Sequence, residues 1–291
     1  MKHMKELLLT LVAVILVGCG TSSTVPITGR KQNLLVTDAE INSMALKQYQ
    51  QTLQSSKLSS NAANTAMVKR VGEKLASAVV SYLKNNGLAD EVKNYDWEFN
   101  LVQDNQVNAW CMPGGKIVVY EGLLPVTQDE ASLAIVLGHE IAHAVAKHSA
   151  ERLSSSYRQQ YGTQILGTVL AGSGLSQGTT QLIALGTSLG SQLYTSGFSR
   201  KQESEADHMG LIFAAMAGYD PQVATSFWQR MASQGSGSAS LFSDHPSDET
   251  RIKDIQKWMP EALKYYKGGS KTGKNAGGST QIKTTKTIRI K

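Results

Sequence analysis

The chain of 291 residues is 41% hydrophobic and 18% charged, a length and composition that allow one substantial buried core. Its formal net charge of +6 comes from the C-terminal stretch 267–291, which holds seven basic residues and no acidic one, so the body of the chain is slightly acidic. A body without a basic excess, together with the export pattern described next, argues against nucleic-acid binding.

The N-terminus has the pattern of an export signal. A basic start precedes the apolar stretch 7–17, which is too short to cross a bilayer as a lasting helix. Residues 16–19 read Leu-Val-Gly-Cys and resemble the lipobox of bacterial lipoproteins. This predicts a signal peptide at 1–18, a lipidated Cys19 and an anchored linker at 19–36, with an uncleaved membrane anchor as the alternative.

The residue after Cys19 is Gly20, which differs from the aspartate that resembles an inner-membrane retention signal. In a two-membrane bacterium this favours an outer-membrane anchor with the chain facing the periplasm. Once Cys19 is acylated, Cys111 is the remaining thiol, so no intrachain disulfide is expected. Because Cys111 lies between Trp110 and Met112, we expect it to pack as a small apolar residue in a strand rather than to act as a reactive sensor.

The domain predicted at 37–266 begins with two scaffold helices. Thr37 and Glu40 form an expected capping box for a helix that ends near Gln54. The range 61–86 predicts a longer helix, which Gly87 ends.

Strand-like runs follow at 97–102, 107–110 and 117–120, with a Pro-Gly-Gly turn between the last two. They predict a small sheet. An edge strand of such a sheet can bind an extended peptide by main-chain hydrogen bonds, which makes Asn108 and Ala109 candidate substrate-binding residues. For Asn108 and Ala109 alike, an ordinary structural role in the strand and turn is an equally weighted alternative.

The next helix is predicted from a capping box of Thr127 and Glu130 to about Arg152. Within it, His139 and His143 lie about 40° apart on one face, so both imidazoles can hold one metal ion.

Between these histidines, Glu140 is placed to act as a general base on a water molecule beside the metal. The positions that a metzincin would fill with glycine and histidine are Ala146 and Ser149, which excludes that class. His148 falls about 180° round a continuous helix from His139, so a surface or second-shell role is expected for it.

A further helix starting at Arg200 supplies the expected third ligand. Glu203 and Asp207 are four residues apart and share a face, so Glu203 can bind zinc while Asp207 accepts a hydrogen bond from a ligand histidine. Glu205 points roughly the opposite way. Two histidines and one glutamate leave the fourth zinc position open, which is typical of a catalytic site.

Between these helices, the stretches 161–170 and 180–193 suggest a helical hairpin packing over the active-site cleft. A helix after Pro221 contains Phe227 and Trp228. His245 lies in a loop, where it could donate a hydrogen bond to the oxyanion or close the open zinc position and keep the enzyme latent. The residues leave both roles open.

The C-terminal stretch 267–291 mixes lysines with glycine, serine and threonine, which predicts a disordered basic tail. We expect this tail to lie in solvent, and contact with anionic lipid or lipopolysaccharide is the alternative.

Several motifs occur together: HEIAHxxxxH from His139, ExEADxxG from Glu203 to Gly210, HPxxxxRI from His245 to Ile252 and NAWCMPGGKI from Asn108 to Ile117. The set resembles the gluzincin zinc metalloendopeptidase family of the CaaX prenyl protease and HtpX, and within it the bacterial lipoprotein or periplasmic members. The resemblance implies an α+β, mainly helical fold, with a zincin-type minidomain and a small β-sheet beside the HExxH helix.

The resemblance also implies one zinc ion per chain held by His139, His143 and Glu203, with Glu140 as the base, Asp207 behind a ligand and His245 near the zinc. Expected substrates are misfolded or stalled envelope and outer-membrane proteins, and an unknown envelope partner could regulate the enzyme. The alternative is a catalytically silent zinc lipoprotein that acts as a chaperone or scaffold.

Overall fold

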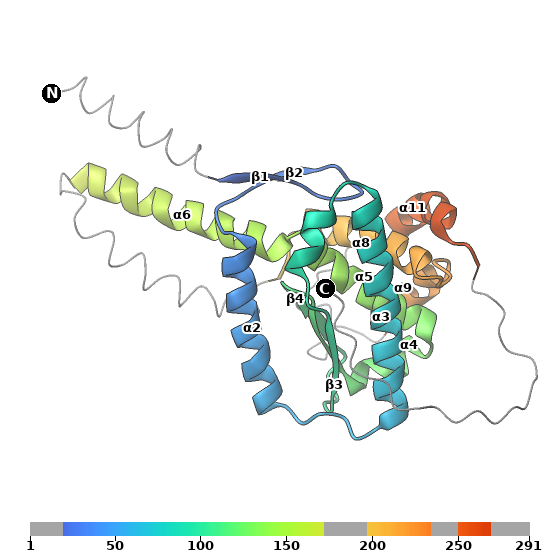
Figure 1. Ribbon diagram of the computed structural model, residues 1–291. Coiled ribbons are helices and arrows are strands. Elements are labelled where there is room, and N and C mark those ends of the chain that lie inside the picture. Colours follow the sequence, from blue (N-terminus) through green and yellow to red (C-terminus); the bar gives the residue numbers. More distant parts are fainter. Residues whose placement is uncertain (1–19, 172–196, 234–249, 269–291) are drawn as a thin grey trace, which may run out of the picture.

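The computed structural model describes residues 20–171, 197–233 and 250–268 (Figure 1). The signal peptide, Cys19, the second apolar stretch at 180–193, His245 and nearly all of the basic tail lie outside these residues. In chain order the described elements are β1 (Thr21–Thr24), β2 (Lys31–Leu34), α2 (Asp38–Ser55), α3 (Ala62–Asn85), η1 (Ala89–Asn94), β3 (Glu98–Val102), β4 (Ala109–Met112), β5 (Lys116–Tyr120), η2 (Glu121–Leu123), α4 (Leu124–Thr127), α5 (Glu130–Val145), α6 (His148–Ala171), α8 (Arg200–Met216), α9 (Val223–Ser233) and α11 (Arg251–Tyr265).

The predicted α+β fold, mainly helical with a small sheet, is confirmed. The capping box of Thr37 and Glu40 begins α2, and Gly87, at a φ of 76°, follows the end of α3. Across the described ranges, no helix combines the length and the hydrophobicity that a membrane span needs.

The main sheet has the strand order β3-β5-β4, with β5 parallel to β3 and antiparallel to β4. The predicted turn joins β4 to β5, where Gly115 N donates to Met112 O at 3.0 Å. Side chains alternate between the two faces of the sheet, as the strand repeat of two residues requires. Phe99 and Ile117 join the core of α3 and α5, while Val118 packs with residues of α2.

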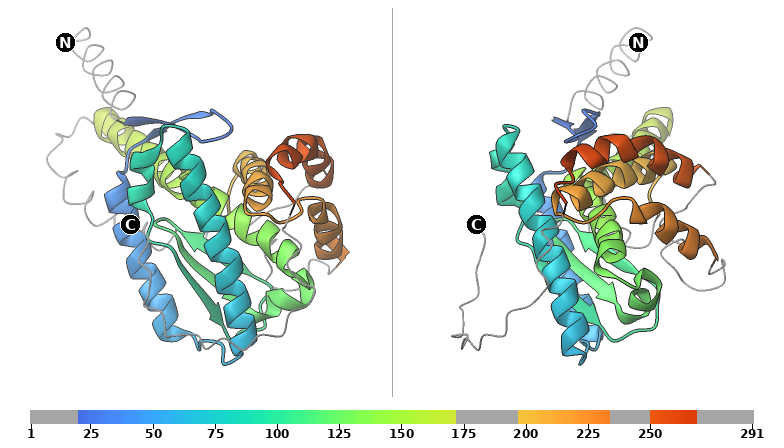
Figure 2. Two further views of the ribbon diagram at one scale, coloured as in Figure 1. Left: turned by 45° about the vertical axis from the view of Figure 1, so that its right-hand side comes forward. Right: turned by 90° about the vertical axis from the view of Figure 1, so that its right-hand side faces the viewer.

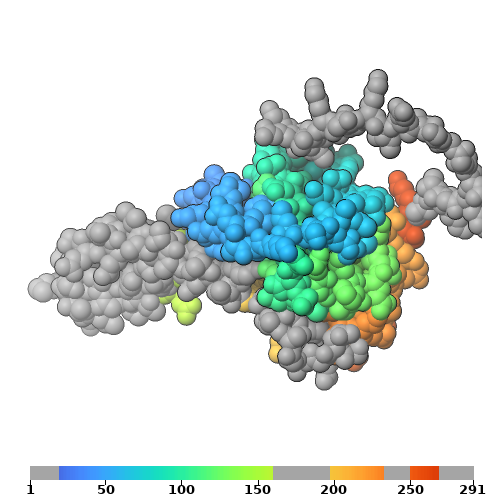
Figure 3. Space-filling view, turned by 90° about the horizontal axis from the view of Figure 1, so that it is seen from below, coloured from blue at the N-terminus to red at the C-terminus, as the bar shows by residue number. Residues whose placement is uncertain are grey.

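The sheet is therefore a layer between α2 on one face and α3 with α5 on the other, as both views of Figure 2 allow the reader to follow. Seen from below, α2 and α3 (blue to cyan) lie beside the green part of the chain (Figure 3). This arrangement places β4 directly against α5, the helix that contains the HExxH motif.

Helix α5 crosses α8 at an unusually close backbone contact, near the centre of the molecule (Figure 1). A Cβ atom added to Gly138 would lie 2.7 Å from Gly210 O, and one added to Gly210 would lie 2.6 Å from His139 N. Only glycine fits at either position without a shift of the helices. The contact brings the first turn of α8 opposite the histidines of α5.

The bounds of α5 correct two sequence predictions. Asp129, rather than Thr127, caps the helix, because its side chain accepts from Ser132 N at 2.7 Å while Thr127 ends the preceding α4. The helix ends at Val145 rather than near Arg152.

Lys147 adopts a left-handed φ of 56° directly after this end, and α6 starts at the next residue. Ion pairs with Asp38 at 2.8 Å and Glu91 at 2.9 Å hold the lysine there. Left-handed backbone is costly for a residue with a Cβ atom, so partners from other elements fix this break.

Part of the stretch 19–36, which was expected to be a linker, forms an antiparallel hairpin of β1 and β2 (Figure 1). We call residues 21–34 the N-terminal hairpin. Val25, in its turn, is 1% exposed and belongs to the main core. The hairpin is thus a packed part of the domain.

Candidate metal centre

His139, His143 and Glu203 converge between α5 and α8, as the spacing of their motifs predicted. The two imidazole Nε2 atoms lie 3.0 Å apart, and each lies 3.4 Å from an oxygen of Glu203. All three side chains are buried, and their potential ligand atoms lie within 4.8 Å of one another. Within the described residues, they form the group suited to hold a metal ion.

This donor set fits zinc. Two Zn–N bonds of about 2.0–2.1 Å at a tetrahedral angle place their nitrogens roughly 3.3 Å apart, close to the separations found between these atoms. Imidazole and carboxylate ligands suit zinc, and three protein ligands leave one position for water or substrate. His139, His143 and Glu203 are therefore the residues that would hold a zinc ion.

Asp207 lies behind His139, as predicted. His139 Nδ1 is 2.9 Å from Asp207 Oδ1, so this nitrogen donates to the carboxylate and the opposite Nε2 presents its lone pair to the centre. Burial alone would lower the pKa of His139, but hydrogen bonds with Asp207 and Glu203 raise it to about 9. The two carboxylates thus make a cation between the ligands favourable.

Arg251 is a member of this site whose position the sequence analysis missed. Its Nη2 donates to Asp207 Oδ1 at 2.6 Å, and its guanidinium lies 3.4 Å from the ring centre of Trp228. The arginine is the Arg of the HPxxxxRI motif, so the signal was present without an assigned role. Arg251 holds Asp207 in the orientation that supports His139.

Glu140 is 2% exposed on α5, between the two histidines in sequence. Burial, and then the charge of Glu140, raise the pKa of the Cys111 thiol well above its usual value. Cys111 therefore stays protonated in its strand at neutral pH, in agreement with the expected packing role.

Strand β4 is an edge strand in the described sheet, since β5 is its partner on one side. Asn108 O accepts from Tyr120 N at 3.1 Å, and Asn108 Oδ1 accepts from Ala109 N at 2.9 Å. Asn108 therefore fixes the end of the strand. Antiparallel alternation directs the main-chain groups of Ala109 and Cys111 away from β5. Substrate binding by Asn108 and Ala109 remains a prediction.

His148 occupies a different place from the one that a continuous helix predicted. It is completely buried, with Nδ1 2.8 Å from His143 Nδ1 and Nε2 3.0 Å from Glu205 Oε2. The break after Val145 turns the chain and returns His148 to the ligand histidine. A continuous helix would have kept His148 away from His143, but of the two roles expected for it, surface or second-shell, the structure shows the second.

Glu205, which the sequence analysis placed away from the metal, contacts this second histidine instead. Burial would raise the pKa of Glu205, but hydrogen bonds from His148, Thr28 and Arg30 lower it to about 2. The sequence did not indicate that Thr28 and Arg30 of the N-terminal hairpin are its partners, because they lie more than 170 residues away along the chain.

Comparison with known proteins agrees with this geometry. A model of the family described as Peptidase family M48 matches residues 62–259. The mitochondrial metalloendopeptidase OMA1 of Schizosaccharomyces pombe is 41% identical over 169 residues, which cover 57% of this chain and 48% of the relative.

Other relatives come from animals and bacteria. A mitochondrial metalloendopeptidase OMA1 from Bos taurus is 30% identical over 251 residues, covering 82% of this chain and 46% of the relative. The beta-barrel assembly-enhancing protease of Escherichia coli is 28% identical over 173 residues, covering 58% and 35%. The chain thus spans about half the length of these curated relatives, or less.

Proposed function

The chain belongs to peptidase family M48, as its motifs predicted, and from this premise we propose that it is a zinc-dependent endopeptidase. The observation that carries the proposal is the convergence of His139, His143 and Glu203, with Glu140 on the same helix and an edge strand beside it. This is the arrangement that peptide hydrolysis needs: a site for a Lewis acid, a base, and an edge strand that can pair with an extended chain.

Each residue then has a definite task. A zinc ion held by the three ligands would supply Lewis-acid chemistry, polarising a carbonyl and lowering the pKa of water. Glu140 takes a proton from the attacking water and passes it to the leaving amine. Asp207 and Arg251 keep His139 oriented through the contacts described above. The outward main-chain groups of β4 align the substrate.

We assign the natural substrates to the unfolded or misassembled proteins of a bacterial envelope. Support comes from the lipobox-like sequence at 16–19 and from relatives named beta-barrel assembly-enhancing protease in Yersinia pestis and Escherichia coli. In this proposal Cys19 carries lipid in the outer membrane, and the domain faces the periplasm. The hairpin that starts at Thr21 then holds the domain close to the membrane surface.

The proposal predicts zinc-dependent cleavage by the full-length chain in detergent. We expect one equivalent of zinc and cleavage of casein, with both lost after chelation and restored by added zinc. Because the ligands come from two helices far apart in sequence, zinc at about 1,000 times its Kd stabilises the fold by about 4 kcal/mol, so chelation lowers the unfolding temperature by about 10 °C. An unfolding temperature unchanged by chelation would contradict the ligand assignment.

The same assay distinguishes the enzyme from the silent scaffold. We expect His245→Ala to raise casein cleavage if His245 keeps the enzyme latent, and to lower it if His245 stabilises the oxyanion. A scaffold would hold one equivalent of zinc and show no cleavage in wild type or in this variant, and that result would overturn the peptidase proposal.

A further inference from the structure

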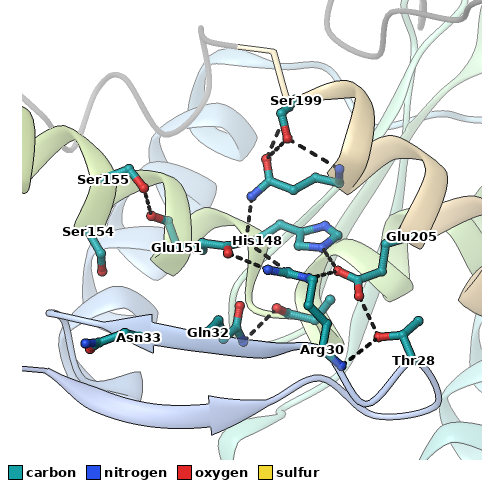
Figure 4. A network of polar contacts seen from close by, with 12 residues as sticks. Thr28, Arg30, Gln32, Asn33, His148, Glu151, Ser154, Ser155, Ser199 and Glu205 are labelled. Carbon is teal, nitrogen blue, oxygen red and sulfur yellow. Dashed lines mark hydrogen bonds and ion pairs between the residues drawn. The ribbon is translucent and has the colours of Figure 1, made fainter.

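A chain of polar contacts connects the N-terminal hairpin with the ligand His143. Figure 4 shows its part from the hairpin to His148. At the metal end of this chain, two histidines are in contact: His143 Nδ1 and His148 Nδ1 lie 2.8 Å apart. To present the Nε2 lone pair to a metal, a neutral His143 must carry its proton on Nδ1. His148 Nδ1 then accepts this proton's hydrogen bond, and His148 carries its own proton on Nε2.

Glu205 receives the second hydrogen bond and fixes this tautomer. His148 Nε2 lies 3.0 Å from Glu205 Oε2, and a carboxylate can only accept. The carboxylate thereby sets the direction of both hydrogen bonds: His143 donates to His148, and His148 donates to Glu205. His148 is fully buried and Glu205 is 8% exposed, so water does not readily replace either partner.

The hairpin holds the carboxylate in place. Thr28 Oγ1 donates to Glu205 Oε1 at 2.5 Å, and Arg30 Nε donates to Glu205 Oε2 at 2.8 Å. The rest of the Arg30 guanidinium binds both oxygens of Glu151 on α6, at 2.5 and 3.0 Å. Figure 4 shows Arg30 between the two carboxylates. Arg30, a residue of the hairpin, thus binds both α6 and α8 behind the ligand His143.

Further contacts dock the hairpin onto the same region. Gln32 Nε2 donates to Ala146 O, directly after α5, at 3.1 Å. Asn33 O accepts from Arg158 Nη2 at 2.6 Å, and directly after the hairpin Leu35 N donates to Ser154 Oγ at 2.8 Å. These bonds fix the hairpin on the end of α5 and on α6, so the position of Arg30 is determined by several independent contacts.

We propose that the N-terminal hairpin is a working part of the metal centre, in which Thr28 and Arg30 act as positioning residues for His143 through Glu205 and His148. The inference deepens the proposed function and rests on it for the metal, but it needs no turnover. Loss of a hydrogen-bond partner behind a ligand typically weakens metal binding 10–100-fold. The segment that adjoins the expected lipid anchor therefore sets the metal affinity of the site.

The test compares Arg30→Gln and Glu205→Gln with Lys31→Gln, an exposed charge in β2 that makes no contact in the chain of hydrogen bonds. Zinc affinity of the full chain is measured by competition with a chelator, and the visible spectrum of the cobalt-substituted protein reports the ligand geometry. We expect the first two variants to bind zinc about 10-fold more weakly and to show a shifted cobalt spectrum, with the control unchanged.

Zinc affinities of Arg30→Gln and Glu205→Gln within twofold of wild type, with an unchanged cobalt spectrum, would overturn the inference. If Glu205→Gln does not fold, Thr28→Val decides, because it removes one hydrogen bond to Glu205 and keeps the size of the side chain. Unchanged zinc affinity in that variant would also overturn it. Wild-type protein that binds zinc but cuts no casein would contradict the proposed function alone, since the affinity differences would still be measurable.

Discussion

Glu140→Gln is expected to lower the rate of peptide cleavage about 10³-fold while zinc stays bound. Glutamine has the size of glutamate but cannot take a proton from water, so the substitution removes the base and leaves the ligands in place. Glu140 is buried beside His139 and His143, which is where a base for a shared metal must lie. Casein cleavage and zinc content should be measured on the same sample.

Glu130→Gln is the matched control, because it makes the same chemical change at the start of the same helix. Glu130 pairs with Arg70 at the protein surface and lies outside the metal centre. We expect this variant to cut casein at the wild-type rate. If Glu140→Gln also cut casein at that rate, the assignment of Glu140 as the base would be wrong. If the Glu140→Gln protein lost its zinc, Glu140 would have a structural role instead.

Gly210→Ala is expected to destabilise the fold by about 3 kcal/mol and to weaken zinc binding strongly. A Cβ atom at this position would lie 2.6 Å from the backbone nitrogen of His139 and 2.8 Å from the carbonyl carbon of Gly138. Backbone cannot rotate away as a side chain can, so α8 must move from α5. That movement separates Glu203 from the two histidines.

Helix propensity alone predicts the opposite sign for Gly210→Ala, because alanine stabilises a helix interior by about 0.5–1 kcal/mol relative to glycine. Denaturant unfolding of the zinc-loaded and chelated protein therefore separates the two effects. Ser204→Ala, in the same helix, is the control and should leave both stability and zinc affinity near wild type. A more stable Gly210→Ala protein with unchanged zinc affinity would show that the close crossing does not position the ligand.

Sequence was most informative where chemistry depends on neighbours along one element. His139 and His143 share a face because a helix repeats every 3.6 residues, and Glu203 and Asp207 do so for the same reason. The sequence information for the turn between β4 and β5 was equally local, since Gly115 must adopt a φ of 82° there. In each case the residues that predict the feature lie within a few positions of the residues that form it.

Prediction failed where a distant segment decided the local geometry. Nothing within α5 shows that it ends at Val145, because the left-handed Lys147 depends on Asp38 and Glu91 from other elements. For that reason the sequence allowed a second-shell role for His148 but did not identify His143 as its partner. The hairpin was mistaken for a linker because two strands of four residues carry little signal, and its polar partners lie directly after α5 and on α6 and α8.

By itself the sequence determined the family, the zinc ligands' positions on their helices and the candidate base, because these follow from residue type and helical or strand periodicity. Only the tertiary structure decided that α5 and α8 meet through Gly138 and Gly210, and that Glu205 and His148 connect Arg30 with His143. Contacts between residues far apart in the chain depend on how whole elements pack, and periodicity within one element does not contain that information.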